Sequence, residues 1–151
     1  MPTSGGNRLR LVLDTNVVVA GLLWNGPPRR LLTAAVEGGV ALFSSQVLLA
    51  ELTQTLAYPK FANRLSAFGT TFEALVAHYA ALVDLVTPTE VHRVVFDDAD
   101  DDHVIAAAVT ARAELIVTGD RKHLLPIGAH QGVAIVTVRE ALERIEARGK
   151  T

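Results

Sequence analysis

Residues 9–16 read LRLVLDTN and decide the fold class. The five residues Leu9–Leu13 form a short apolar run, which predicts a buried strand that ends at Asp14. Segments of helical pattern alternate with four further apolar runs, at 40–43, 91–96, 115–118 and 134–138. Such alternation predicts parallel strands joined by crossover helices. The expected fold class is therefore α/β: a three-layer α/β/α sandwich with a central, mainly parallel, five-stranded sheet.

Capping residues and helix breakers mark the expected helices. Ser45 offers an N-cap for a helix that runs to about residue 57. Two capping boxes, Thr70-x-x-Glu73 and Thr137-x-x-Glu140, predict the starts of two more helices, ending near residues 83 and 149. The other helices are expected from about residue 17, over 28–37, over 61–67 and over 97–112.

The length indicates a single domain over residues 1–151, of which 1–7 are expected to be disordered. The absence of cysteine excludes disulfide scaffolds, thiolate zinc sites and cysteine nucleophiles, and it fits a reducing cytosol, so a cytoplasmic location is expected. No secretory signal is expected, because residues 1–7 are small and polar and lack the apolar region of such a signal. No membrane span is expected, because the apolar run Leu9–Trp24 is interrupted by polar residues and falls short of about 20 residues. A net charge of −2 excludes a protein held on nucleic acid mainly by its overall charge.

Two acidic residues follow expected strands. Asp14 comes directly after the first strand, and Asp120 follows the strand at 115–118 and the turn residue Gly119. Open parallel sheets bind ligands just beyond the carboxyl ends of their strands. Each residue also has a plain structural interpretation, because Asp14 is a suitable N-cap and Asp120 is a common turn residue.

Two further acids lie on the apolar faces of expected helices. Glu51 belongs to a stripe that also contains Leu48, Leu52, Thr55 and Leu56, although its head could still bend into water. Asp102 leads a second stripe, which continues with Ile105, Ala106 and Val109. The other acids of the run at 97–102 are interpreted as a solvated helix start, which the helix dipole favours.

Together these four carboxylates predict a metal site at one edge of the sheet. They would repel one another and could not all stay ionised without a cation. Hard oxygen ligands suit Mg²⁺ or Mn²⁺. Without these four acids, 14 basic residues stand against 12 acidic ones, so the remaining surface is slightly positive and suits a phosphodiester substrate.

The remaining charged residues carry weaker signals. Three pairs could hold phosphates or could simply keep the protein soluble: Arg29 with Arg30, Lys60 with Arg64, and Arg121 with Lys122. The histidines lack ligand spacing and are expected at the surface or in satisfied core positions: His78, His92, His103, His123 and His130.

Four motifs in order resemble the PIN-domain ribonucleases, specifically the toxin-type branch related to VapC. They are Val12-Leu13-Asp14-Thr15-Asn16, Ser44-Ser45 with Leu48-Leu49-Ala50-Glu51-Leu52, Asp102-His103-Val104-Ile105-Ala106-Ala107, and Ile116-Val117-Thr118-Gly119-Asp120. The resemblance implies an α/β/α domain that hydrolyses RNA with metal-activated water. It also implies an antitoxin protein partner and a homodimer.

Carried over residue by residue, the resemblance implies a catalytic, metal-binding set and its polar neighbours. The acids of this set are Asp14, Glu51, Asp102 and Asp120, with Asp101 as an alternative register for Asp102. The neighbours are Asn16 and Thr118, which would orient a carboxylate or water, and Ser45, a helix cap that would also line the pocket. Some relatives carry another acid after the Asp120 position, where this chain has Arg121, so one or two ions remain possible.

Three other classes of protein share part of this pattern. Haloacid-dehalogenase-like phosphatases use a strand-end aspartate as nucleophile but require a second aspartate two residues later, where this chain has Asn16. Receiver domains require a lysine at the end of a late strand, where this chain has Thr118. A non-catalytic module that binds a metal ion or nucleic acid is the third.

Overall fold

The structure is a computed structural model that describes residues 8–89 and 99–149. In this part of the chain, no helix is long and apolar enough to cross a membrane. The elements run in the order β1 (Leu9–Leu13), α1 (Thr15–Leu23), α2 (Pro27–Val36), β2 (Val40–Ser44), α3 (Gln46–Leu56), η2 (Pro59–Phe61), α4 (Ala62–Ala67), α5 (Phe72–Leu82), β3 (Asp84–Leu85), α6 (Ala99–Ala111), β4 (Leu115–Val117), η3 (Leu125–Ile127), β5 (Ala129–His130), β6 (Val133–Val136) and α7 (Val138–Gly149).

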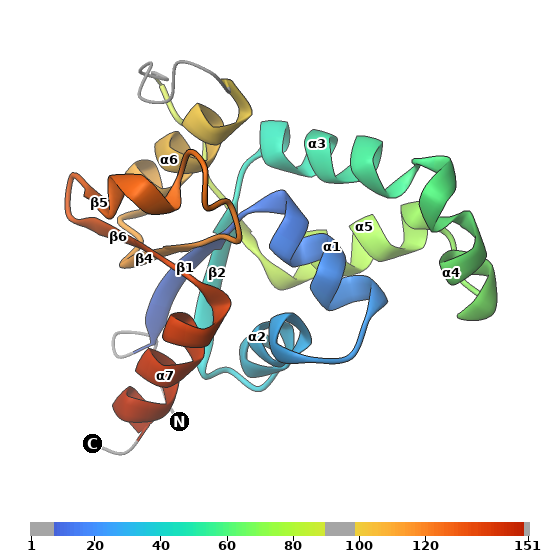
Figure 1. The fold of residues 1–151 in the computed structure, drawn as a ribbon, viewed down its shortest axis with the longest axis horizontal. Coiled ribbons are helices and arrows are strands. Elements are labelled where there is room, and N and C mark those ends of the chain that lie inside the picture. Colours follow the sequence, from blue (N-terminus) through green and yellow to red (C-terminus); the bar gives the residue numbers. More distant parts are fainter. Residues whose placement is uncertain (1–7, 90–98, 150–151) are drawn as a thin grey trace.

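The strands form one sheet in the order β3-β2-β1-β4-β6-β5 (Figure 1). All neighbours pair in parallel except β5 and β6, which form an antiparallel hairpin. The described residues thus contain six strands rather than the expected five, because the two-residue strands β3 and β5 are too short to show a sequence pattern. The strand expected at 91–96 lies outside the described residues.

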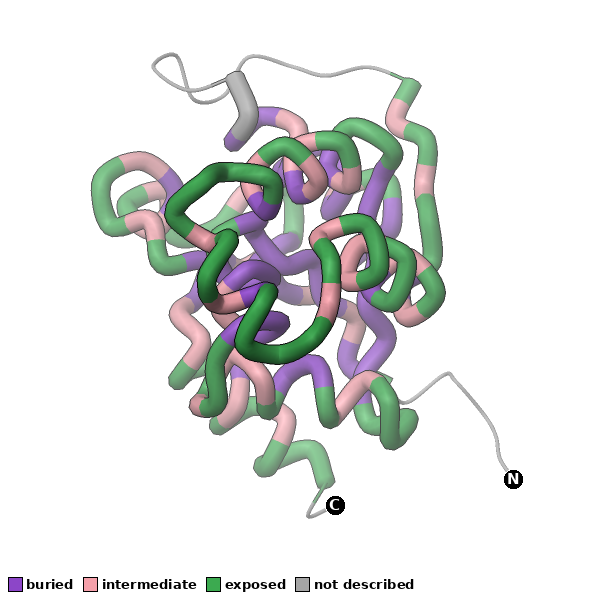
Figure 2. Tube along the Cα trace, turned by 90° about the vertical axis from the view of Figure 1, so that its right-hand side faces the viewer, coloured by how far each residue is buried: buried purple, intermediate pink, exposed green. Residues whose placement is uncertain are grey.

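Both faces of the sheet are covered, which confirms the three-layer α/β/α architecture. In β1, Leu11 and Leu13 pack with the helices of one layer, and Val12 packs on the opposite face with residues of α6. Figure 2 shows the buried residues gathered inside, with exposed residues along the outer turns of the helices. Burial on both faces explains why β1 reads as a nearly continuous apolar run.

Helix starts mostly follow the expected capping residues. Ser45 Oγ accepts a hydrogen bond from Leu48 N–H at 3.3 Å, and the Thr137–Glu140 box forms in both directions. The box expected at Thr70 is wrong: Thr71 caps α5 instead, with its Oγ1 accepting from Ala74 N–H at 3.1 Å. Thr70 and Thr71 carry the same capping hydroxyl, so the sequence alone does not decide which of them is the N-cap.

Candidate metal centre

Asp14 lies at the carboxyl end of β1 and is buried. Its Oδ1 accepts a hydrogen bond from Thr15 N–H at 2.8 Å, so it caps α1, which begins two residues earlier than expected. Its Oδ2 accepts from the Thr118 hydroxyl at 2.7 Å. Both carboxylate oxygens are therefore held in position, and although Asp14 caps the helix it still lines a cavity.

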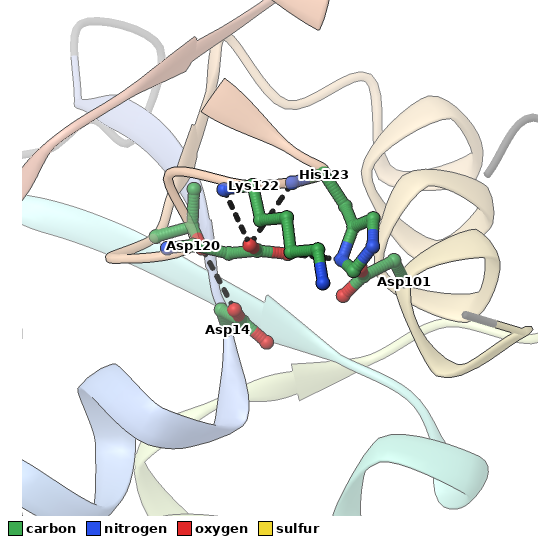
Figure 3. Close-up of polar contacts among 6 residues, drawn as sticks. Asp14, Asp101, Asp120, Lys122 and His123 are labelled. Carbon is green, nitrogen blue, oxygen red and sulfur yellow. Dashed lines mark hydrogen bonds and ion pairs between the residues drawn. The ribbon is translucent and has the colours of Figure 1, made fainter. Parts of the chain in front are cut away.

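Asp120 lies in the turn after β4, the strand beside β1 (Figure 3). Its Oδ1 accepts hydrogen bonds from the backbone N–H groups of Lys122 and His123, each at 3.0 Å. Burial by itself would raise the pKa of Asp120. The N–H groups of His123 and Lys122, then the Asp101 side chain and the charge of His123, outweigh burial and hold that pKa below its usual value. The turn therefore favours an ionised carboxylate.

Glu51 reaches the same region from α3. Its Oε1 accepts a hydrogen bond from the hydroxyl of Thr15, the first residue of α1. The side chain is half-buried, so the apolar stripe of α3 holds this carboxylate at the boundary between the core and solvent. This hydrogen bond from Thr15 connects Glu51 of α3 to the first residue of α1.

Asp101 and Asp102 lie in the first turn of α6, and both are buried, at 5% and 3% exposure. Asp101 lines the cavity beside Asp14 and Asp120, whereas Asp102 is not among the described residues that line it. Within the described residues, the structure thus brings the alternative register, Asp101, to the other acids.

The orientation of α6 explains this placement. The most deeply buried face of the helix, which packs in the core with sheet residues, is formed by Val104, Ala107, Ala108 and Ala111. Asp101 precedes Val104 by three residues and so continues this face toward the carboxyl ends of the strands. The stripe led by Asp102 lies to one side, because its later member Val109 is only half-buried.

His123 is the residue that sequence reasoning missed. Its Nδ1 lies 3.6 Å from Asp120 Oδ2 and 4.0 Å from Asp101 Oδ2. The only signal in the sequence was that His123 follows Asp120 by three residues. This spacing in a turn does not reveal that Asp101 of α6 lies beside both side chains. The prediction of a surface or satisfied core role for this histidine did not anticipate the contact.

These residues open onto one cavity of about 440 Å³. Its described lining is Asp14, Thr15, Asn16, Glu51, Thr55, Asp101, Gly119, Asp120 and His123. Thr118 lies buried behind Asp14, and Ser45 is a buried helix cap that is not among the described lining residues. Asn16 is exposed at the cavity.

The donor set fits a divalent cation. One ligand atom from each of Asp101, Asp120 and His123 lies within 4.8 Å of the other two. Ligands on opposite sides of an ion with metal–oxygen distances of 2.0–2.6 Å lie about 4–5 Å apart, so this spacing matches a single ion. Asp14 and Glu51 line the same cavity and add carboxylate oxygens, the ligands that Mg²⁺ and Mn²⁺ prefer.

Comparison with known proteins identifies a family for most of the chain. Residues 10–122 match the family model described as PIN domain. A comparison with curated proteins gave no match. The matched region includes the cavity acids, from Asp14 to Asp120.

Proposed function

The chain belongs to the PIN-domain family, whose members are generally metal-dependent nucleases, and from this premise we propose that it is a Mg²⁺- or Mn²⁺-dependent endoribonuclease. It would hydrolyse RNA phosphodiester bonds with water as the nucleophile. The observation that carries the proposal is the convergence of four carboxylates from four separate segments on one cavity: Asp14, Glu51, Asp101 and Asp120. Four carboxylates in one cavity would repel one another strongly if no cation were bound between them.

Asp101, Asp120 and His123 are proposed to hold one ion, with Asp14 and Glu51 as further ligands that line the same cavity. Asp102 remains a predicted ligand, and a comparison of Asp101→Asn with Asp102→Asn tests which of the two binds the ion. When bound, the ion supplies Lewis acidity, lowering the pKa of a water and neutralising charge on the phosphate. One or two ions are compatible with this ligand set.

Uncharged neighbours give the carboxylates fixed positions. Thr118 holds Asp14 and Thr15 holds Glu51, so neither acid has to reorganise when substrate enters. Asn16, exposed at the cavity, is positioned to hydrogen-bond a phosphate oxygen or the attacking water. These roles support hydrolysis by positioned water and require no covalent protein nucleophile.

Cleavage of an end-labelled single-stranded RNA tests the proposal. The wild-type protein should cleave with Mg²⁺ or Mn²⁺ and lose cleavage in excess EDTA. Asp14→Asn should reduce the rate by about a hundredfold or more, a loss typical for removal of one electrostatic contact in an active site. Asp84→Asn is the matched control, because Asp84 is exposed on β3 and is not among the described cavity residues. Metal binding without cleavage would support the non-catalytic module instead.

We also propose that this nuclease is the toxin of a two-gene pair, inhibited by an antitoxin protein, and that it acts as a cytoplasmic homodimer. The support is the resemblance of its four motifs to the toxin-type branch of the family. Induced expression should arrest growth, and Asp14→Asn should relieve the arrest. Co-expression of the neighbouring reading frame should restore growth without a change in the level of this protein.

A further inference from the structure

Five aromatic and basic side chains form a continuous ladder where α1 ends beside η2 and α4. The Arg64 guanidinium lies over the Phe68 ring at 4.4 Å and over the Trp24 ring at 5.4 Å. The Trp24 ring meets the Phe61 ring edge-on, with centroids 6.0 Å apart, and Lys60 Nζ lies 5.1 Å from the Phe61 centroid. We call this set, Phe68-Arg64-Trp24-Phe61-Lys60, the aromatic–basic surface.

Two rings of the aromatic–basic surface are open to solvent, whereas the third, Phe61, is partly buried and packs against the core. Trp24 is 42% exposed and Phe68 is 47% exposed, whereas the preceding Leu23 is fully buried. Arg64 Nε donates a hydrogen bond to Leu23 O at 2.8 Å, which fixes α4 against the end of α1 and leaves the terminal nitrogens of the guanidinium as additional donors.

The two segments that build this surface carry charges of one sign only. The segments 15–36 and 52–72 contain none of the 16 acidic residues, although the chain as a whole carries a net charge of −2. They contain four basic residues: Arg29, Arg30, Lys60 and Arg64. Acids are thus excluded from the two segments that build the surface, and its charge complements a polyanion.

We propose that the aromatic–basic surface binds single-stranded RNA outside the metal centre, with bases stacking on Trp24 and Phe68 and phosphates paired with Lys60 and Arg64. Exposed aromatic rings combined with cations bind single strands with little dependence on sequence, because every base has a stacking face. Protein interfaces are also rich in aromatic residues and arginine, so the absence of acidic residues from both segments is the observation that favours a polyanion. The inference rests on the proposed ribonuclease function, because it assigns a second contact to the same substrate.

The path from the metal centre to this surface follows α1. Thr15 and Asn16 line the cavity at the start of the helix, and Trp24 follows its last residue, so the two sites are separated by about 13 Å of helix at 1.5 Å per residue. In Figure 1, α4 lies on the side of the molecule toward which α1 ends. At about 3.4 Å per stacked nucleotide, roughly four nucleotides would span the interval.

Tryptophan fluorescence measures this binding directly, because Trp24 is the only tryptophan. With EDTA present to prevent cleavage, a 12-nucleotide oligouridylate should quench the emission, and an RNA duplex should not. Trp24→Ala and Lys60→Glu should weaken binding of a labelled oligouridylate by roughly 5- to 100-fold, whereas Trp24→Phe should retain it. Arg139→Glu on α7 is the control for the same charge change at an exposed position.

The outcomes separate this inference from the proposed function. Binding that depends on Trp24 and Lys60, in a protein that cleaves no RNA under any metal condition, would support the surface and overturn the nuclease. The RNA-binding role of the surface would be overturned if both variants, shown by thermal melts to be folded, kept metal-dependent cleavage and RNA binding unchanged. Loss of self-association in these variants without any change in RNA binding would also overturn it, and would assign the surface to a protein interface.

Discussion

The Thr118 hydroxyl donates a hydrogen bond of 2.7 Å to Asp14 Oδ2 and joins the ends of two neighbouring strands. The hydroxyl oxygen of Thr118, Oγ1, also accepts a hydrogen bond of 3.0 Å from Asp120 N–H. One buried side chain thereby sets the positions of the acid after β1 and of the turn that carries the acid after β4. The spacing of the two carboxylates therefore depends on a residue that is itself completely buried.

Replacing Thr118 should disturb the candidate metal centre without removing a charged group. Thr118→Val keeps the shape but loses the hydroxyl, so metal affinity should fall about 10- to 100-fold, as is typical for residues that orient metal ligands. Thr118→Ser should restore most of the affinity. Calorimetric titration with Mn²⁺ checks both variants, and equal affinity in Thr118→Val and the wild type would contradict the orienting role.

The two buried acids of α6 are separated by a matched pair of variants. Binding of an ion at a hundredfold excess over its Kd should add about 2.7 kcal/mol to the free energy of unfolding, which raises the Tm of a protein of this size by roughly 5–10 °C. Asp101→Asn should greatly reduce this rise, and Asp102→Asn should retain most of it. The measurement is a thermal melt with and without millimolar Mn²⁺, and the opposite pattern would identify Asp102 as the ligand.

An ion pair far from the cavity predicts a pH dependence of stability. Arg148 donates two hydrogen bonds to the Glu114 carboxylate, at 2.8 and 3.1 Å, and these hold the pKa of Glu114 below its usual value. Because the folded-state pKa is the lower one, the contribution to stability is full above the unfolded-state pKa and is lost as the pH falls through the folded-state value. Both side chains are about 40% exposed, so the contribution should not exceed about 1 kcal/mol.

Arg148→Gln should therefore raise the pKa of Glu114 toward its ordinary value, as measured by an NMR titration of the carboxyl carbon. Its destabilisation relative to the wild type should be present at pH 7 and vanish near pH 2. Arg144→Gln, a change at another exposed arginine of α7, is the control. A pKa of Glu114 that does not respond to Arg148→Gln would refute the assignment.

Tyr79 offers a test of packing, because its hydroxyl is buried and lacks a hydrogen-bond partner among the described residues. Burial also raises the pKa of this phenol, which keeps it neutral. A buried polar group without a partner costs about 1–3 kcal/mol, so Tyr79→Phe should increase the free energy of unfolding by about 1 kcal/mol. Urea denaturation measures this free energy of unfolding, and Tyr58→Phe, at an exposed position, is the neutral control. Destabilisation by Tyr79→Phe would show that the hydroxyl of Tyr79 is hydrogen-bonded.

The main strands could be predicted because burial on both faces imposes a local, readable composition. Residues 9–13 match β1 at both ends, and residues 115–118 match β4 within one residue. The strands β3 and β5 could not be predicted, since two residues carry no periodicity and pair only because a neighbouring edge is available. Similarly, adjacent threonines at 70 and 71 offer the same capping group, and the helix geometry selected Thr71.

By itself, the sequence determined that Asp14 and Asp120 follow buried strands, and parallel pairing then requires their carboxyl ends to face the same edge. Only the tertiary structure decided that Asp101 rather than Asp102 opens onto the cavity and that His123 joins it. A strand ends where its apolar residues end, which is local information. The rotation of α6 about its axis and the path of a turn depend instead on packing against residues distant in the chain, so a run of similar acids cannot reveal them.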